Sequence, residues 1–397
     1  MRDNGLVLGL GNNIDYEFEW SGLDFQSRID SFGIEFREIQ SVPHVVRSER
    51  ELVIAVLNRI YADGGGEFFL ESPSLASEFA PGAPKKITMG GTGIRAAIAL
   101  DRIGIASTAH FVTMNDDVRR LTPRGCRVIW AGTKENLYPH LIFQYPEGAA
   151  FRLADGRTVR SQRSNRVIMS NDQDNIDLPI SGALGEALKS ARVFQVAGFN
   201  VISDEAQLID RVERLKKAIL ELPAAGIVFY EEAGFYRPEF RDRIFSILDG
   251  LVDIYSLNED EFQELVSPEP DLNDPASVVG GLDALRKRFG VDTIVLHTKD
   301  WGLVRGKNAG KYVEALSAGI RMAATRYAKG DDFTAADFAA TADEMKSPEG
   351  LAFREKIDGL NLPELVCVPG YRIELEAGKA TTIGLGDSFV GGFLSDL

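Results

Sequence analysis

The chain has 397 residues, of which 44% are apolar and 26% charged, a composition typical of a soluble enzyme with a large core. Its formal net charge of −15 argues against a general binder of nucleic acid or anionic membranes, because such proteins carry a basic face. Two cysteines are too few for a disulfide framework, and we find no signal-peptide pattern and no apolar run of membrane-spanning length. We therefore expect a cytoplasmic protein.

Short apolar runs recur along the chain, and helical patterns lie between several of them. The runs are residues 6–10, 106–113, 193–197, 227–230, 252–257 and 293–296. In the helical patterns at 93–103 and 205–222, apolar residues favour one side of the helix. Strands that alternate with helices predict an α/β fold with a mostly parallel sheet covered on both faces. Ligands of such sheets bind beyond the carboxyl ends of the strands.

Three stretches break this alternation, at about residues 16–45, 64–86 and 127–170. The first mixes aromatic and charged residues, the second starts with three glycines before an apolar segment, and the third alternates like antiparallel strands. We interpret them as a discontinuous, smaller β-rich lid on a single catalytic domain that spans residues 1–397. A lid would exclude water, which competes with an acceptor hydroxyl for a phosphoryl group. The alternative is three unrelated surface excursions.

Polar residues after the first strand suit a sugar. Asn13 and Asp15 are spaced to face one side of an extended segment, and an amide with a carboxylate can bond neighbouring hydroxyls. Gly90 and Gly91 precede a predicted helix, where glycines let a substrate approach the backbone. The alternatives are a polar turn over residues 9–15 and a tight strand-to-helix turn at the glycines.

Arg163 and Arg166 form a pair of cations three residues apart in an acidic chain. Such a pair can hold a sugar phosphate, because arginine binds phosphate oxygens in a fixed fork. The alternative is that they are surface arginines paired with Asp172 or Asp174.

Acidic residues near the ends of two predicted strands can organise Mg²⁺ beside nucleotide phosphates, since magnesium keeps several waters and few protein ligands. Glu232 follows the strand at 227–230, and Glu261 lies three residues after Asn258. Alternatively, Asn258 and Glu261 form a capping box worth about 1 kcal/mol, and Glu232 belongs to a solvated strand end.

His297 and Thr298 close another strand just before Trp301, and an aromatic ring with polar neighbours can border an adenine. The four histidines are dispersed along the chain, so they do not support a zinc site. No Ser-His-Asp or Cys-His arrangement is indicated.

The segment at 381–393 is the most informative. Gly384, Leu385 and Gly386 lead into Asp387 and then into a run with the apolar spacing of a helix. Backbone N–H groups at a helix start point outward and the helix dipole adds positive potential, so a phosphate can bind there. Asp387 at the edge of that site can take a proton from an attacking hydroxyl. The alternative is that Asp387 only caps the helix.

Taken in order, these segments resemble one family along almost the whole chain: the ADP-dependent sugar kinases (glucokinase and phosphofructokinase) of the ribokinase-like superfamily. The matching segments are 11–15, 89–91, 140–146, 163–166, 197–200, 258–261, 297–300 and 384–387. Each is weak alone, and their order and spacing together are specific. The short stretch after Asp387 also resembles the ADP-dependent branch.

The resemblance implies a ribokinase-like three-layer core with a β-rich lid, and Mg²⁺-dependent transfer of the β-phosphoryl group of ADP to glucose or fructose 6-phosphate, leaving AMP. It implies that Asp387 is the general base and that Gly384, Leu385 and Gly386 supply anion-hole amides. Implied for the sugar are Asn13, Asp15, Gly90 and Gly91, with Glu67 where glucokinases hold a glutamate and Arg163 and Arg166 where phosphofructokinases hold the sugar phosphate. Implied for the metal are Glu232 and Glu261, and for the nucleotide Asn258, His297, Thr298 and Ile383.

Two positions depart from the family pattern. Tyr230 stands where the family usually has the histidine of a His-x-Glu motif, so the metal role of Glu232 rests on a broken motif. Thr92 replaces a glutamine commonly seen after the paired glycines, a change in the implied sugar site. Glu67 points to glucose and the arginine pair to fructose 6-phosphate, which leaves the acceptor open.

Two other functions also stay open at this point. One is an ATP-dependent ribokinase-type (PfkB) kinase acting on a carbohydrate or nucleoside, and the other is a catalytically silent homologue that binds sugar or nucleotide. We expect a glycolytic enzyme whose partners are a sugar or sugar phosphate and an adenine nucleotide. We expect no nucleic-acid or membrane partner, and a monomer or small homo-oligomer.

Overall fold

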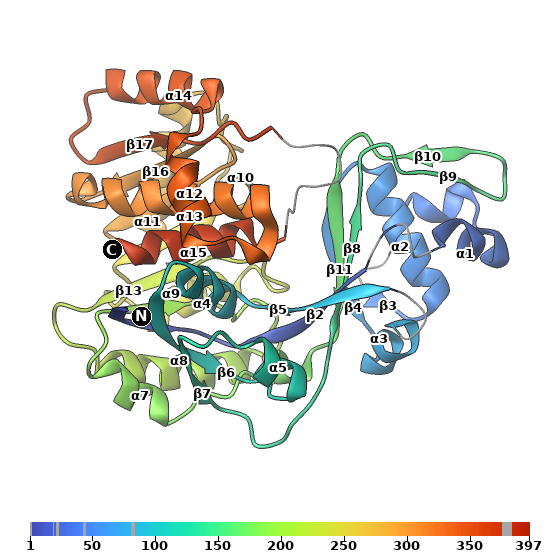
Figure 1. The fold of residues 1–397 in the computed structure, drawn as a ribbon, viewed down its shortest axis with the longest axis horizontal. Coiled ribbons are helices and arrows are strands. Elements are labelled where there is room, and N and C mark those ends of the chain that lie inside the picture. Colours follow the sequence, from blue (N-terminus) through green and yellow to red (C-terminus); the bar gives the residue numbers. More distant parts are fainter. Residues whose placement is uncertain (1, 19, 21–23, 43–44, 81–83, 375–382) are drawn as a thin grey trace.

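The computed structural model describes residues 2–18, 20, 24–42, 45–80, 84–374 and 383–397 (Figure 1). These residues form a large lobe around a nine-stranded sheet and a small lobe around a six-stranded sheet. In the part of the chain just given, no helix is both long and apolar enough to cross a bilayer.

The large sheet has the strand order β17-β16-β15-β14-β13-β12-β1-β6-β7. From β15 to β7 all neighbouring strands are parallel, whereas β16 and β17 pair antiparallel. All six predicted apolar runs lie in this parallel part, which confirms the α/β prediction. The strands are β1 (Arg2–Leu8), β6 (Ile105–Phe111), β7 (Cys126–Trp130), β12 (Val193–Val196), β13 (Ile227–Glu231), β14 (Ile254–Asn258), β15 (Thr293–His297), β16 (Trp301–Gly306) and β17 (Leu365–Pro369).

Helices cover both faces of the large sheet. Side chains alternate between the two faces along each strand, so apolar side chains on both faces need a covering layer. On one face, α4 (Thr92–Arg102), α12 (Val313–Lys329) and α15 (Leu385–Ser395) pack on a core that includes Phe229, Ile254 and Val295. We call it the α15 face. We call the opposite face the α9 face. There Phe194, Tyr230 and Tyr255 belong to a core covered by α7 (Ala183–Leu188), α8 (Glu205–Ile219), α9 (Phe240–Ile247), α10 (Glu259–Leu265), α11 (Pro275–Phe289) and α14 (Pro348–Gly359).

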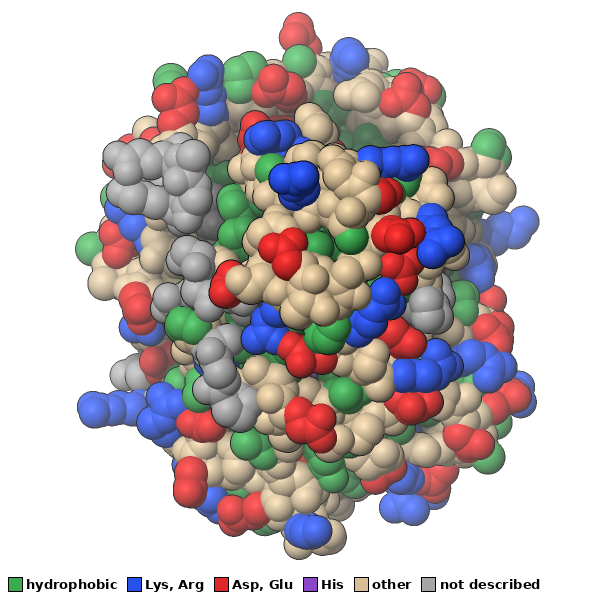
Figure 2. Space-filling model, turned by 90° about the vertical axis from the view of Figure 1, so that its right-hand side faces the viewer, with side chains coloured by type: hydrophobic (Ala, Val, Ile, Leu, Met, Phe, Trp, Pro, Cys, Tyr) green, Lys and Arg blue, Asp and Glu red, His purple; other side chains and the backbone are tan. Residues whose placement is uncertain are grey.

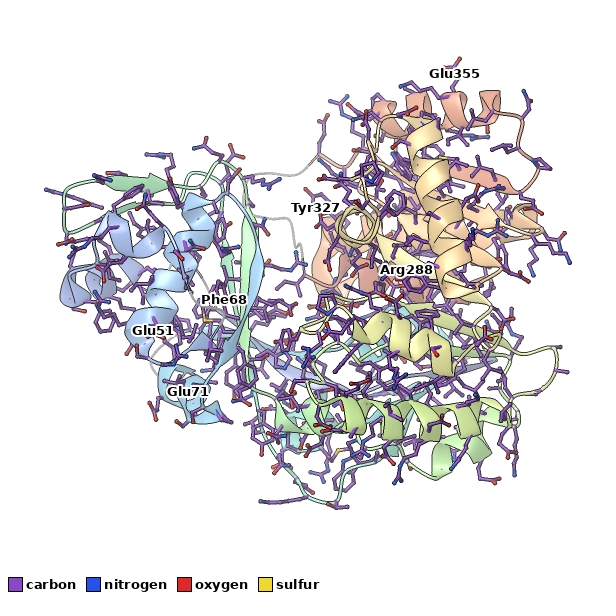
Figure 3. All side chains as sticks on the ribbon, turned by 180° about the vertical axis from the view of Figure 1, so that it is seen from behind. Glu51, Phe68, Glu71, Arg288, Tyr327 and Glu355 are labelled. Carbon is purple, nitrogen blue, oxygen red and sulfur yellow. The ribbon has the colours of Figure 1, made fainter. Side chains whose placement is uncertain are left out.

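The small sheet has the order β3-β4-β11-β8-β2-β5. Its apolar side packs against helices over a separate core, into which Phe68 points (Figure 3). The elements of this lobe are β2 (Asn13–Phe18), α1 (Phe25–Phe32), β3 (Val45–Val46), α2 (Glu49–Tyr61), β4 (Gly66–Leu70), α3 (Pro73–Phe79), β5 (Lys85–Gly90), β8 (His140–Tyr145), the hairpin β9 (Ala150–Arg152) and β10 (Thr158–Arg160), and β11 (Asn165–Ser170). Three short helices, α5 (Asp116–Leu121), α6 (Gln173–Asp177) and α13 (Ala335–Ala340), and several 3₁₀ turns complete the described fold.

The predicted pieces of the lid do not coincide with the small lobe. Helix α2 lies between the first two pieces yet packs in the core of the small lobe, and residues 126–130 form the edge strand β7 of the large sheet. Residues 13–15 begin β2 rather than end the first strand, because the segment 9–12, which contains two glycines, lets the chain leave one sheet and enter the other. The glycines at 64–66 join α2 to β4 inside the small lobe. Whether this lobe acts as a lid stays a prediction.

The surface at the outer end of the small lobe carries interspersed acidic and basic side chains (Figure 2). Among the side chains coloured in that view, blue and red groups alternate over short distances and no broad basic area forms.

Candidate active site

Helix α15 begins at the motif that the sequence singled out. Gly384 is its N-cap, with φ of 66° in the left-handed region, and Leu385, Gly386 and Asp387 form the first turn. A Cβ on Gly384 would lie 2.8 Å from Cδ of Arg95, so the position requires glycine for its space as well as its conformation. Helix geometry leaves the first-turn N–H groups without intrahelical partners, which makes this end of the helix suited to an anion. Ile383, just before it, is buried and its carbonyl accepts a hydrogen bond from Arg326.

A buried arginine connects Asp387 to the small sheet. The side chain of Arg95, on α4, is 3% exposed, and its Nη2 donates to Oδ2 of Asp15 at 2.6 Å. Its guanidinium also lies 3.6 Å from Glu17 and 3.8 Å from Oδ2 of Asp387, whose side chain is 24% exposed. Burial lowers the pKa of Arg95, but Asp15, Asp387 and Glu17 outweigh this and raise it. Arg95 is therefore a permanent cation shared by both lobes.

The predicted sugar residues come together at the start of β2. Asn13 Nδ2 donates to Oδ1 of Asp15 at 2.6 Å, and both side chains are buried. Gly90 of β5 lies directly opposite Asn13, and a Cβ there would be 2.5 Å from Asn13 Nδ2 and from Asp15 Oδ2. Gly91 follows with φ of 103° as the N-cap of α4. The two glycines therefore serve close approach to polar side chains as well as the turn into the helix.

His140 extends this polar cluster, although it was not among the predicted site residues. Its Nε2 lies 3.2 Å from Oδ2 of Asp172 and its Nδ1 lies 3.9 Å from Oδ1 of Asp15. Burial lowers the pKa of His140, but Asp172, Asp15 and Glu67 together raise it above its usual value. His140 thus favours its charged form. The matching segment at 140–146 was the only sequence signal for it.

A small cavity lies where the lobes meet. Its lining comes from both lobes and consists of Phe69, His140, Ser170, Asp172, Asn175, Ile176, Val201 and Tyr236. Glu67 borders the same region: solvent reaches its side chain, yet the surrounding protein raises its pKa by desolvation, with His140 and Arg166 acting against that shift. Glu67 also raises the pKa values of His140 and Tyr236, which line the cavity, so its carboxylate lies near that cavity.

The two predicted phosphate-binding arginines do not form a pair. Arg163 is 68% exposed and contacts Asp63, with Nε 2.9 Å from its carbonyl oxygen and 3.5 Å from Oδ2. Arg166, on β11, acts electrostatically on Glu67. The alternative pairing with acidic residues at 172 and 174 is wrong, because Asp172 pairs with His140 and Asp174 bonds Thr113 and Asn136.

Glu232, a predicted metal residue, is fully engaged on the α9 face. Its Oε1 accepts from Nε of Arg241 at 2.6 Å and its Oε2 accepts from the hydroxyl of Tyr255 at 2.6 Å. Its side chain is completely buried, and both oxygens already accept hydrogen bonds inside the protein, so neither faces a metal-binding surface. The structure thus removes the geometric basis for Glu232 as a metal residue.

Glu261 and Asn258 do form the capping box of α10. Asn258 Oδ1 accepts from the Glu261 N–H at 3.0 Å, and Glu261 Oε2 accepts from the Asn258 N–H at 2.9 Å. Burial raises the pKa of Glu261 well above its usual value, and Glu231 and Glu232 raise it further. In the described ranges no three His, Cys, Asp or Glu side chains are arranged to hold a metal directly. A magnesium ion there would depend on water and phosphate ligands.

His297 lies under the first turn of α15. Its ring stacks on Phe389 with centroids 4.4 Å apart, and its Cε1 is 3.4 Å from the position of a Cβ on Gly386. Its Nε2 lies 3.1 Å from Oε1 of Glu231. Sequence reasoning passed over Glu231, which is the middle residue of the broken motif.

Thr298 holds the turn between β15 and β16. Its hydroxyl donates to the carbonyl of Trp301 and accepts from the N–H groups of Asp300 and Trp301. Trp301 is buried and stacks on Phe353 at 4.2 Å, so its ring does not border an open nucleotide site.

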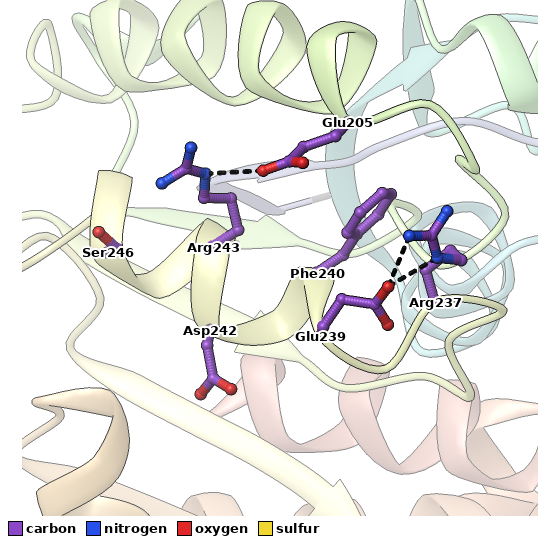
Figure 4. A pocket seen from close by; sticks show the side chains of 7 residues that line it. All are labelled: Glu205, Arg237, Glu239, Phe240, Asp242, Arg243 and Ser246. Carbon is purple, nitrogen blue, oxygen red and sulfur yellow. Dashed lines mark hydrogen bonds and ion pairs between the residues drawn. The ribbon is translucent and has the colours of Figure 1, made fainter.

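A second hollow lies between α8 and α9 (Figure 4). It is lined by Glu205, Arg237, Glu239, Phe240, Asp242, Arg243 and Ser246. Arg243 pairs with Glu205 and Arg237 with Glu239, all at exposed positions, so these charges are compensated within the chain.

Comparison with known families decides the membership of the chain. A family model described as the ADP-specific phosphofructokinase/glucokinase conserved region matches residues 4–357. The chain belongs to this family. No curated protein sequence gives a match.

Solved structures of the ADP-dependent kinases share the fold. A phosphofructokinase from Pyrococcus horikoshii OT3 with AMP is similar over 99% of this chain and 97% of its own, with 16% identity and a TM-score of 0.78. An ADP-dependent kinase in complex with fructose-6-phosphate and ADPβS covers 99% and 93%, with 14% identity and a TM-score of 0.77. A reconstructed last common ancestor of the ADP-dependent phosphofructokinases from Methanosarcinales covers 99% and 94%, with 15% identity and a TM-score of 0.73.

Proposed function

We propose that this member of the family is an ADP-dependent sugar kinase that transfers the β-phosphoryl group of ADP to a sugar hydroxyl and releases AMP. The observation that carries the proposal is the placement of Asp387. It lies at the N-terminus of α15, and its carboxylate contacts Arg95, which also forms an ion pair with the proposed sugar-binding residue Asp15. The proposed base Asp387, the anion site at the start of α15 and the proposed sugar-binding Asp15 thus all lie close to the guanidinium of Arg95.

The proposed reaction assigns a task to each of these groups. Asn13 and Asp15 hold the acceptor by its hydroxyls, and the carboxylate of Asp387 receives the proton of the attacking hydroxyl. The hydroxyl oxygen forms a bond to the β-phosphorus as the bond to the bridging oxygen breaks, and AMP leaves with that oxygen. The N–H groups of the first turn of α15 stabilise the negative charge of the group in transfer.

Mg²⁺ belongs to this proposal as the ion that neutralises phosphate charge when bound. Glu261 fits a hydrated ion, because it lies half-buried at the start of α10 in an acidic setting and magnesium needs few protein ligands. Glu232 does not fit, since Arg241 and Tyr255 occupy both its oxygens.

Two acceptors suit the recess between the lobes. Glu67 favours glucose, because a carboxylate there can bond hydroxyls and repels a phosphate. Arg166 favours fructose 6-phosphate, the ligand named for a related kinase of known structure. If glucose is the acceptor, Glu67→Ala raises the KM for glucose and Arg166→Ala leaves it nearly unchanged. The reverse pattern with fructose 6-phosphate would identify a phosphofructokinase.

The decisive experiment is a screen of donors against acceptors in the presence of Mg²⁺, with AMP and ADP quantified among the products. We expect AMP to form from ADP only when a sugar acceptor is present. Turnover of ATP to ADP without use of ADP would identify a ribokinase-type donor instead. Tight binding of nucleotide and sugar by calorimetry without turnover of any pair would identify a silent homologue.

A further inference from the structure

Arg326, in the last turn of α12, reaches the segment that begins α15. Its side chain is 3% exposed, and its Nε donates to the carbonyl oxygen of Ile383 at 3.0 Å. Its Nη1 lies 2.5 Å from Oδ1 of Asp331, whose Oδ2 accepts from Lys86 of the small lobe at 2.8 Å. One guanidinium nitrogen is therefore held in an ion pair while another bonds the main chain.

The carbonyl of Ile383 belongs to the same peptide unit as the N–H of Gly384. A trans peptide unit is planar, and its C=O and N–H point in opposite directions. A donor that fixes the Ile383 carbonyl therefore also fixes the direction of the Gly384 N–H. Glycine needs such support, because without a Cβ it adopts either sign of φ readily. The Gly384 N–H belongs to the proposed anion site, so its direction matters for a phosphoryl group bound there.

The body of α15 is held by packing rather than by Arg326. Helix α12 packs along α15, and glycines bring the two helices into close contact (Figure 1). A Cβ on Gly319 of α12 would lie 2.8 Å from Cε2 of Phe389, and a Cβ on Gly392 of α15 would meet the carbonyl oxygen of Ala318. The hydrogen bond from Arg326 thus acts locally, on the turn that leads into the helix.

Two buried arginines adjoin the start of α15, Arg326 at the Ile383 carbonyl and Arg95 beside Gly384. Burial lowers the pKa of Arg326, and so does the like charge of Arg95, while Asp331 opposes both. Burial raises the pKa of Asp331, but nearby cations, Arg326 foremost, lower it to about 2. Asp331 is thus ionised and gives Arg326 a charged partner. The two guanidinium groups also favour an anion at this end of the helix.

We propose that Arg326 is a positioning residue for phosphoryl transfer. It holds the Ile383 carbonyl so that the Gly384 N–H points at the group in transfer, and Asp331 holds Arg326 for this task. This inference rests on the proposed function. Arginine suits the task better than lysine, because its planar fork bonds the carbonyl and the carboxylate at once, whereas an ammonium is a single compact group.

Arg326→Lys tests this role while it keeps the positive charge. Turnover of ADP is measured with glucose and with fructose 6-phosphate, and the affinities for ADP and AMP are measured by calorimetry, all with Mg²⁺. We expect kcat to fall about 10- to 100-fold, up to the cost of misplacing a reacting group by about 1 Å, and the sugar KM to stay within about threefold. ADP affinity should fall about 10-fold, as for a hydrogen bond to a charged group, and AMP affinity should change less than about threefold, because AMP lacks the β-phosphoryl group.

Arg321→Lys is the matched control on the same helix. The guanidinium of Arg321 lies over the ring of Phe338, 5.1 Å from its centroid. This control should keep the wild-type kcat and the wild-type affinities for ADP and AMP.

A second pair of variants serves if Arg326→Lys does not fold. Asp331→Asn weakens the hold on Arg326, because a neutral acceptor forms a weaker hydrogen bond than a carboxylate, and we expect kcat to fall about 3- to 10-fold. Asp332→Asn is its control, one residue along the chain. Asp332 is exposed and pairs with Arg102 of α4 at 2.9 Å, so this control should keep the wild-type kcat.

Wild-type kcat in Arg326→Lys would overturn the inference and leave the proposed function intact. Parallel losses of ADP and AMP affinity, or equal losses of kcat in Arg326→Lys and Arg321→Lys, would also overturn it, because either result marks a general structural effect. A wild-type protein that forms no AMP from ADP with either sugar, and binds ADP no more tightly than AMP, would overturn the proposed function itself.

Discussion

Replacing Gly384 with alanine tests whether the first turn of α15 and Arg95 form one rigid unit. At φ of 66° the left-handed conformation alone should cost about 1–2 kcal/mol for alanine. The new Cβ would also lie 2.8 Å from Cδ and 2.9 Å from Nη1 of Arg95, and 3.2 Å from Oδ2 of Asp387. Arg95 cannot yield freely, because its guanidinium is held at 2.6 Å by Asp15. We therefore expect α15 or Arg95 to shift, which displaces Asp387.

A displacement of about 1 Å at a reacting group can cost about 100-fold in rate, and we expect a loss of that order in kcat. AMP formation gives the rate, and urea titration gives the free energy of unfolding. Gly280→Ala in α11 is the control, because open space surrounds that exposed position and alanine favours a helix interior over glycine. A Gly384→Ala protein with wild-type kcat and stability would refute the reasoning.

Three further substitutions address the same cluster. Asp387→Ala should keep ADP binding by calorimetry and lower kcat about 10²–10⁴-fold, the typical contribution of a general base. Arg95→Met should lower the free energy of unfolding in urea by about 3–5 kcal/mol, because it strands buried carboxylates without their cation. His140→Asn should lose most stability in acid: a raised pKa stabilises the folded state fully below the ordinary value of 6.5, and the difference from wild type should shrink as pH rises above it in thermal melts.

For each of these three substitutions, one experimental result would contradict the prediction. Unchanged kcat in Asp387→Ala would remove that carboxylate from the proposed chemistry. Unchanged unfolding in Arg95→Met would mean that water already screens its ion pairs. A stability difference for His140→Asn that grows with pH would show that His140 is neutral in the folded protein.

The parallel sheet was predictable because most of its strands contain short, mainly apolar runs of sequence. Residues 193–197 and 293–296 are buried on both faces of the sheet, so most of their side chains are apolar and the strands can be recognised in the sequence. The small lobe was harder to delimit. Helix α2 is buried along most of its length and looks like one more helix of the main core, although it packs in the other lobe.

The candidate site was predictable where function depends on backbone shape. Gly384 and Gly90 are needed for close approach, and glycines at such places are visible in a sequence. The burial of Glu232 on the α9 face was not visible, because the face to which a side chain points depends on its position along the strand. Arg95 was hidden for a related reason: a buried arginine in a mainly apolar helix gains its role only from carboxylates on other elements.

The chain crosses between the lobes at 9–12, 91, 131–139 and 171–172, and these links all meet the small sheet at one end of its strands. Asn13, Gly90, His140 and Ser170 stand at that end. Any swing of the small lobe must pivot along this line, so these residues have a short lever arm and keep their spacing to α15. The opposite ends of the same strands, at Lys85, Tyr145 and Asn165, travel farthest. If the small lobe acts as the predicted lid, it can therefore open widely while the proposed sugar-binding residues stay almost stationary.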